Sequence, residues 1–348
     1  MKTHDLQFFP ELPYPAFDSG MPPRSRLFSL PPIRVGTASA EGLLSYVIRL
    51  ARAHSVSPRR LVREVFIKAC PELARYRRSG PFFTSTTGTD NGLDGFTRVF
   101  VEAVEKLCCI DAKPLTMIPL KALLPFNAQG LFPSRLRWCP ACYLEMRERG
   151  EIYQPLLWFF DHYRICHQHG CALTDRCLVC GSHQHPLPRS PAIGFCSQCG
   201  AWMGRRAAAE YPPEAFELWK ASAIGEIVAA LPTIEGLATR ERFVSQVKCA
   251  ITQIAGGNRR GFCLEVGIPE LSLQYLLSGD KRPTLSLWLE VSCCLGVGPI
   301  AFLASSFDTI TSRLALRMLP GQLLLRQRHI HGAWCSPIGV PTPFRAVA

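Results

Sequence analysis

The chain has 348 residues, of which 47% are hydrophobic and 19% are charged, and it carries a net charge of +12. This length exceeds one ordinary hydrophobic core and predicts two or three domains. The positive charge favours a polyanionic partner, with nucleic acid ahead of an anionic membrane surface. No apolar run is long enough to span a bilayer and the N-terminus lacks a signal peptide, so we expect a cytoplasmic protein without a membrane partner.

The N-terminal third begins with a proline-rich segment and then turns helical. Residues 1–36 are interpreted as an extended arm, which either drapes over a neighbouring domain or is disordered. Residues 37–135 are predicted to be a helical part. Within it, Gly, Asn, Asp and Thr predict a loop at 80–95, and apolar spacing predicts a helix at about 96–108.

Two short helices are predicted at the start of this helical part. Leu43, Leu44, Val47 and Ile48 share one face of the first. Ser57 is an N-cap candidate for the second, with Pro58 at the first helical position. The pair is either a helix-turn-helix or a simple hairpin. Three cations of the second helix either contact DNA or form a solvated face: Arg59, Arg60 and Arg63.

The segment 136–204 contains four pairs of ligand residues, each with two residues between its members. In a reducing compartment this spacing indicates metal binding ahead of disulfides. Two such turns close a tetrahedron around Zn²⁺ and leave no position for water, so the prediction is two structural zinc ions without catalysis. The ligands of the first ion are Cys139, Cys142, Cys166 and His169, and those of the second are Cys177, Cys180, Cys196 and Cys199.

Several alternatives stay open for this block. His167 competes with His169 for the fourth position of the first site, although the spacing favours His169. Cys171 is expected to stay outside the ligand set. The two sets could also be interleaved, but sequential pairing closes shorter loops. Redox pairs and chance are the remaining explanations, and both are disfavoured by four pairs within 61 residues.

The 23 residues between Cys142 and Cys166 are rich in aromatic side chains and long enough for a helix plus a strand. One interpretation is a small core against the first zinc ion. The alternative is a stacking surface for single-stranded nucleic acid. The side chains concerned are Tyr153, Leu156, Trp158, Phe159 and Tyr163.

The segment 205–318 is predicted to be a helical domain, with helices near 213–230 and 240–255, followed by a basic tail at 319–348. A repressor-like helix-turn-helix is predicted at about 259–303. Gly267 can adopt the positive φ of its turn, and Thr284 can cap the helix that follows.

In such a motif the second helix lies in the major groove. We therefore expect four of its side chains to face bases or nearby phosphates: Glu270, Ser272, Gln274 and Tyr275. Lys281 and Arg282 follow at the position expected for phosphate contacts. The alternative is a helical bundle for protein contacts, since the helix itself carries no cation.

These motifs together resemble the TniQ/TnsD family of transposon target-selection proteins. The resemblance covers about the first 200 residues and is carried by Glu41-Gly42-Leu43-Leu44-Ser45-Tyr46, Arg49-Leu50-Ala51, Trp138-Cys139-Pro140-x-Cys142, Tyr153, Trp158, Cys166-x-x-His169, Leu173 and the two later CxxC pairs. It implies an adaptor, not a transposase. The adaptor would recognise target DNA directly or through an RNA-guided CRISPR complex, and would recruit the transposon's AAA+ ATPase. A homodimer is a further partner expected for such a family.

The expected fold class is mainly α with a small zinc-ribbon module, in a multi-domain chain. A zinc-containing helix-turn-helix transcription regulator is the alternative function, although no ligand-sensing or dimerisation domain is apparent. A nuclease or recombinase would need clustered carboxylates or a phosphate-binding Gly-rich loop. The sequence has neither pattern, so an enzyme is disfavoured.

Overall fold

The computed structural model contains helices and isolated bridges, and the residues that it describes include no strand. It describes residues 24–76, 92–93, 95–125, 131–133, 135–184, 192–204 and 214–304. The predicted fold class, mainly α with two Cys/His clusters, is confirmed. Most of the loop predicted at 80–95, residues 1–23 of the arm and the whole basic tail lie outside these residues.

The strand predicted between Cys142 and Cys166 is wrong. That segment continues the helix α5 (Pro140–Glu148) and then forms the 3₁₀ turn η6 (Leu156–Phe159). Two isolated bridges involve this segment, Pro155 with Glu41 and Ile165 with Ala172, and neither extends into a ladder. Proline lacks a backbone N–H and cannot extend such a pairing.

The helical part before the zinc block consists of short helices that follow one another closely. They are α1 (Leu43–Ala53), α2 (Pro58–Leu61), η1 (Val62–Phe66), α3 (Ile67–Ala69), η2 (Pro71–Tyr76), α4 (Gly95–Cys108), η4 (Lys113–Leu115) and η5 (Ile118–Leu120). Ser57 caps α2 as predicted, because its Oγ accepts a hydrogen bond from the Arg60 N–H at 3.3 Å. The turn η1 is a π-helix, in which the N–H of Ile67 donates to the carbonyl of Val62.

Helix α1 is buried along almost its whole length, because the chain covers it from several sides. The Tyr153 hydroxyl donates to the Ser39 carbonyl at 2.9 Å, and the Leu156 N–H donates to the Ala40 carbonyl at 2.8 Å. These contacts tie the chain just before α1 to the segment between the ligands of the first cluster. The N-terminal helices and the first Cys/His cluster therefore share one core.

A buried carboxylate holds the described end of the proline-rich arm against α1. Glu41 is fully buried and pairs with Arg49 at 2.7 Å, and its oxygens also accept bonds from the Ser45 hydroxyl and the Ile33 N–H. The Arg49 guanidinium also donates to the Pro31 carbonyl at 3.4 Å. Burial raises the pKa of Glu41, and Arg49 opposes this shift. The described end of the arm, residues 24–36, thus lies against the helical part.

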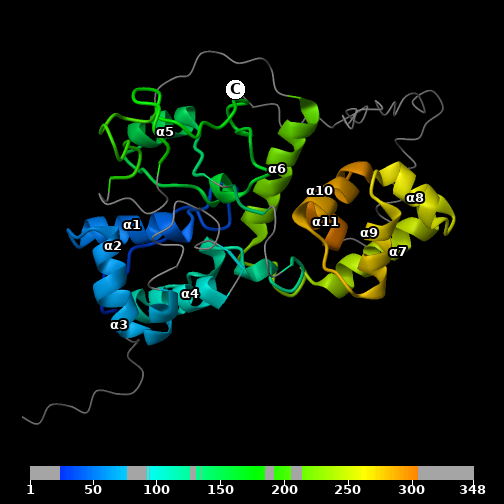
Figure 1. Cartoon of the computed structure of the whole chain (residues 1–348), viewed down its shortest axis with the longest axis horizontal. Coiled ribbons are helices and arrows are strands. Elements are labelled where there is room, and N and C mark those ends of the chain that lie inside the picture. Colours follow the sequence, from blue (N-terminus) through cyan, green and yellow to red (C-terminus); the bar gives the residue numbers. More distant parts are fainter. Residues whose placement is uncertain are drawn as a thin grey trace, which may run out of the picture.

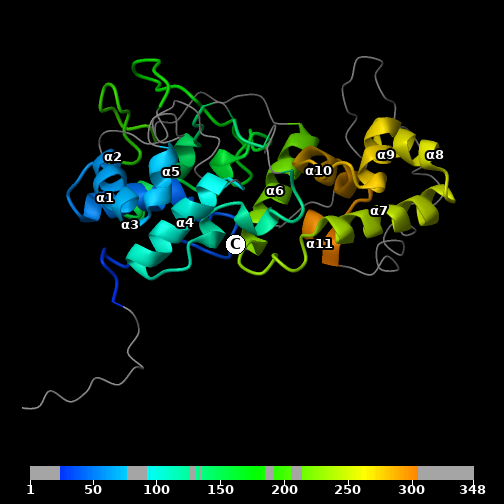
Figure 2. The same ribbon diagram turned by 60° about the horizontal axis from the view of Figure 1, so that its bottom comes forward.

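Helix α6 (Ala215–Ala230) lies between the two halves of the molecule, which are the part of the chain that precedes it and the C-terminal helices that follow it, as Figures 1 and 2 show. It contacts η6 on one side and α11 (Pro299–Ala304) on the other. The Glu226 carboxylate of α6 accepts the Ile300 N–H at 3.2 Å and so caps α11. Burial raises the pKa of Glu226, and the backbone N–H groups of Ile300 and Ala301 oppose this shift.

The C-terminal half is a bundle formed by α7 (Arg240–Ala255), α8 (Arg259–Val266), α9 (Glu270–Ser278), α10 (Leu285–Cys294) and α11. Gly267 ends α8 with φ +80°, and the Thr284 hydroxyl caps α10 by accepting the Leu287 N–H at 3.2 Å, as predicted. Ile268 is buried in the turn between α8 and α9, and Trp288 of α10 is buried with its indole N–H donating to the Pro299 carbonyl at 3.2 Å. Two helices joined by the three-residue turn 267–269, which contains a glycine, have the order expected of a helix-turn-helix.

Within the described ranges, no helix combines the length and the apolar character needed to cross a bilayer.

Candidate metal centres

The first candidate centre lies at the beginning of α5. Cys139 is the N-cap of this helix, and its sulfur accepts the Cys142 N–H at 3.5 Å. The other two ligands come from a tight turn, in which the Gly170 N–H donates to the Cys166 carbonyl at 2.7 Å. Gly170 has φ +62°, a conformation that side chains other than glycine rarely adopt. The helix start and the turn aim their ligand atoms at one point.

The distances between the ligand atoms fit an ion with tetrahedral coordination. The Cys142 and Cys166 sulfurs are 3.6 Å apart, and His169 Nδ1 lies 3.5 Å from the Cys139 sulfur and 3.3 Å from each of the other two. For Zn–S bonds of about 2.3 Å and Zn–N bonds of about 2.0 Å, a tetrahedron requires about 3.8 Å between sulfurs and about 3.5 Å from sulfur to nitrogen. The donor set therefore fits zinc in both distance and chemistry.

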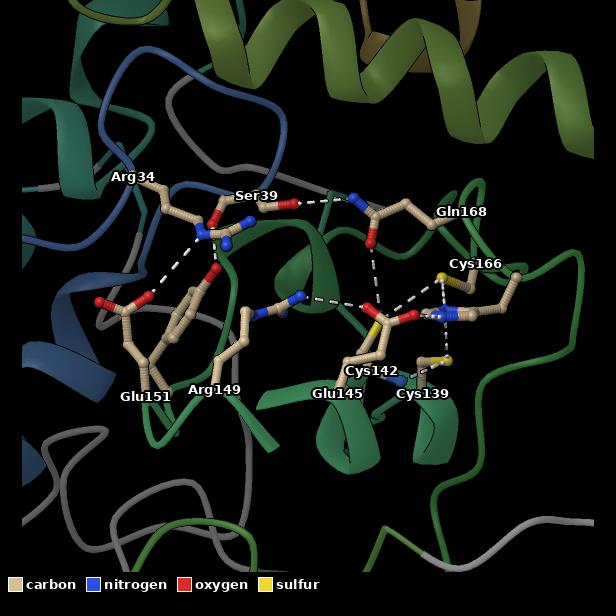
Figure 3. Close-up of polar contacts among 11 residues, drawn as sticks. Arg34, Ser39, Cys139, Cys142, Glu145, Arg149, Glu151, Cys166 and Gln168 are labelled. Atoms are coloured by element: carbon tan, nitrogen blue, oxygen red, sulfur yellow. Dashed lines mark hydrogen bonds and ion pairs between the residues drawn. The ribbon is translucent and has the colours of Figure 1, made fainter. Parts of the chain in front are cut away.

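Glu145 orients the histidine from the next turn of α5. Its carboxylate lies 2.7 Å from His169 Nε2, on the side of the ring away from the sulfurs, and Arg149 pairs with the same carboxylate at 3.4 Å (Figure 3). Hydrogen bonds to Cys166 and Glu145 raise the pKa of His169 to about 9. Carboxylates behind ligating histidines fix the tautomer and the ring orientation of the ligand. Sequence analysis missed Glu145, although its place three residues after Cys142 is visible in the sequence.

The first cluster includes a further thiol at its edge. The Cys171 sulfur lies 3.5 Å from the Cys139 sulfur, so Cys171 is closer to the cluster than the sequence suggested. His167 points elsewhere, since its Nδ1 lies 2.9 Å from the Tyr163 hydroxyl. Gln168 between them donates to the Ser39 hydroxyl at 3.2 Å and thereby ties this turn to the lead before α1 (Figure 3).

The thiols of the first cluster shift one another's pKa values, so that ionisation of one disfavours ionisation of the others. Hydrogen bonds from Cys139 and Cys142 lower the pKa of Cys166, whereas hydrogen bonds to Cys142 and Cys166 raise the pKa of Cys139. A divalent cation would let all three ionise together, because a coordinating thiol is deprotonated outright.

The second candidate centre consists of two similar CxxC turns. The Cys177 and Cys199 sulfurs are 3.8 Å apart, and the Cys180 and Cys196 sulfurs are 3.6 Å apart. The Val179 N–H donates to the Cys177 sulfur and the Gln198 N–H donates to the Cys196 sulfur, each at 3.4 Å. In each of the two clusters the ligand atoms lie within 4.8 Å of one another, and the grouping is sequential rather than interleaved.

The comparison with protein-family models finds TniQ over residues 32–173. The chain contains a TniQ domain. This confirms the family that the motifs indicated, and it indicates a role in transposon-associated target selection. No curated protein matches the chain.

The TniQ match includes the last residues of the arm, α1 and the first cluster, and it ends before Cys177. The second cluster and the helix-turn-helix therefore follow the matched residues. The aromatic side chains of the TniQ domain between Cys142 and Cys166 are all buried, and Tyr143 packs edge-on against Trp158 with ring centroids 4.9 Å apart. These side chains form a core, and their burial leaves no ring surface on which bases could stack.

The predicted DNA-contacting residues lie in two separate parts of the chain. On α9, Glu270, Ser272 and Gln274 are exposed and Tyr275 is half-buried. The Lys281 ammonium lies 4.5 Å from the centre of the Tyr275 ring. The Arg282 guanidinium is directed elsewhere: it donates to backbone carbonyls of the preceding half of the chain, those of Lys121 and Leu124.

The other cations lie in the TniQ domain. Arg60 and Arg63 are exposed and Arg59 is half-buried. Arg63 pairs with Glu64 at 3.0 Å, and Lys68 lies 3.5 Å from the same carboxylate. Part of the charge on this face is thus neutralised within the chain.

Proposed function

We propose that this protein is a target-selection adaptor for transposition. It would bind double-stranded DNA through its C-terminal helix-turn-helix and recruit the AAA+ ATPase regulator of a transposase. The observation that carries this proposal is the presence, in one chain, of a TniQ domain and a helix-turn-helix with an exposed second helix.

Both metal centres are proposed to hold structural zinc. The ligands would be Cys139, Cys142, Cys166 and His169 in the first centre, and Cys177, Cys180, Cys196 and Cys199 in the second. With four protein ligands, each ion has no coordination position left for water or substrate. We therefore assign no chemistry to the metals, which supports an adaptor over an enzyme.

The link between the two halves supports a rigid adaptor. Arg282 donates to the Lys121 and Leu124 carbonyls, and the Arg240 N–H donates to the Ala122 carbonyl at 3.2 Å. On the other side, Glu226 caps α11. These contacts would set the angle between a DNA-reading helix and a recruiting surface on the TniQ domain.

On α9 we propose that Glu270, Ser272, Gln274 and Tyr275 approach the major groove, with Lys281 beside a phosphate. Arg59, Arg60 and Arg63 are proposed as a second, sequence-independent contact. Arg282 would act mainly as the inter-half link. The segments 37–135, 136–204 and 205–318 are proposed as working divisions of the chain, of which the first two share one core.

Two binding experiments test this function. Purified full-length protein is titrated with duplex DNA over a range of salt, and the transposon ATPase is tested for co-elution with it. DNA binding and ATPase co-elution would support the adaptor. DNA binding alone would favour a helix-turn-helix transcription regulator. ATPase co-elution without DNA binding would direct target recognition to an RNA-guided CRISPR complex, for which the same co-elution assay is used. Light scattering with and without DNA tests for a homodimer.

A further inference from the structure

The outward side of α9 has a leucine at its centre. The buried side chains Leu273 and Leu276 define the inner side of the helix. At about 100° per residue, Leu271 lies roughly opposite them. Its side chain is 56% exposed. Gln274, which is exposed, and Tyr275, which is half-buried, flank it on the same outward side.

On the helix that we propose to enter the major groove, an exposed leucine can contact an apolar group of the DNA. The outward side of α9 carries no Lys or Arg, so the bidentate contact that these side chains make with guanine does not come from this helix. In the major groove the C5-methyl group of thymine is the apolar feature, and the adenine edge offers the donor and acceptor that a glutamine amide pairs with. Leu271 and Gln274 are three residues apart, which is about 4.5 Å along the helix axis and suits one base-pair step.

Cations stand at both ends of the helix-turn-helix. Arg259 and Arg260 are exposed in the first turn of α8, where Asn258 caps the helix. Lys281 follows α9 and lies over the Tyr275 ring. Cations placed beside a reading helix that itself carries no Lys or Arg suit a duplex, whose phosphates flank its groove. A protein partner would instead be expected to meet a wider apolar surface.

We propose that Leu271 packs against a thymine methyl group and that Gln274 reads an adjacent adenine, so that α9 selects an A·T-containing step in the major groove. This inference rests on the proposed DNA binding by the helix-turn-helix. It names Leu271 as a specificity-determining residue, which the polar side chains of α9 alone do not indicate.

The test uses full-length protein and duplexes selected by it from a random library. Each thymine of the selected duplex is replaced in turn by uracil, which removes only the methyl group. At one position the wild-type protein should bind the uracil duplex roughly three- to fivefold more weakly, as expected for one buried methyl group. Leu271→Ala should bind both duplexes equally. Leu264→Ala, which truncates a leucine 62% exposed on α8, should keep the wild-type ratio.

A second substitution tests the glutamine. Replacing the adjacent adenine by 7-deazaadenine removes the N7 acceptor and should weaken binding by the wild type but not by Gln274→Ala.

The outcomes separate the two proposals. If the wild type binds its duplex without any uracil-sensitive position, or if Leu271→Ala keeps the sensitivity, the base assignment is wrong and DNA binding stands. If the wild type binds no duplex, the proposed DNA binding by the helix-turn-helix itself is wrong. If Leu271→Ala keeps its uracil ratio and loses ATPase or self-association, α9 is a protein-docking surface and the inference is overturned.

Discussion

Replacing Arg49 by methionine would remove the cation from a carboxylate that has no access to water. Glu41 is 0% exposed and lies 2.7 Å from the Arg49 guanidinium. Removing one partner of a buried pair costs about 3–5 kcal/mol, and the partial exposure of Arg49 favours the lower end, about 3 kcal/mol. Methionine retains the apolar stem of the side chain, so the loss isolates the charge.

The opposite replacement should cost less. Glu41→Gln keeps an acceptor for the Ser45 hydroxyl, and the remaining Arg49 is 19% exposed and also donates to the Pro31 carbonyl. A loss of about 1–2 kcal/mol is expected. In the double variant the total should fall short of the sum of the two single losses, because the residues are in direct contact.

The assay is amide hydrogen exchange in α1, since the chain has several parts and global unfolding is not a two-state process. Arg52→Met, at the exposed end of the same helix, is the matched control and should stay within about 0.5 kcal/mol. If Glu41→Gln costs more than Arg49→Met, or if the two losses add, the carboxylate is not held by this pair and the reasoning fails.

Three further predictions concern the metals and the joint between the halves. Metal analysis should give two zinc ions per chain, and Cys177→Ser should reduce this to one while the first centre stays loaded; loss of both ions would contradict independent centres. Glu145→Ala should weaken zinc binding at the first centre about 10- to 100-fold in a chelator competition, whereas Glu148→Ala, on the exposed side of α5, should not. Because burial raises the pKa of Glu226, the folded state holds this proton more tightly than the unfolded state, so stability should fall as the pH rises above about 4.5. Glu226→Gln should flatten this part of the pH profile in thermal melts, and an unchanged profile would refute the assignment.

Most features of the fold that were predicted depend on residues close to one another in the sequence. The Ser57 and Thr284 caps and the Gly267 turn were predicted because each depends on residues within a few positions in the sequence. The two Cys/His clusters could be grouped for the same reason, as each turn brings its own two ligand residues together. His169 rather than His167 lies at the first cluster because the CxxC-like spacing sets the turn.

Contacts between residues far apart in the chain were not predicted from the sequence. The Glu41–Arg49 pair holds the end of the arm, which has no periodic pattern of apolar residues from which its position could be predicted. Arg282 donates to carbonyls some 160 positions earlier in the chain. The π-helical turn at 62–66 was also missed, because its five residues have the same apolar spacing as an ordinary helix. The wrong strand before Cys166 arose from aromatic content, which favours strands but here fills a core between turns.

The bond from Arg282 to the preceding half has a consequence for geometry along DNA. A duplex gripped by α9 would be held at one rotational setting relative to the TniQ domain, because Arg282 follows α9 directly and its guanidinium is anchored on the other half. DNA turns once every 10–10.5 base pairs. A partner recruited by the TniQ domain would then meet the helix at a constant phase, so that the number of base pairs between the bound site and the partner's point of action would be fixed. Removing the Arg282 contacts together with those of Arg240 and Glu226 would make that spacing variable without weakening the binding of α9 to DNA.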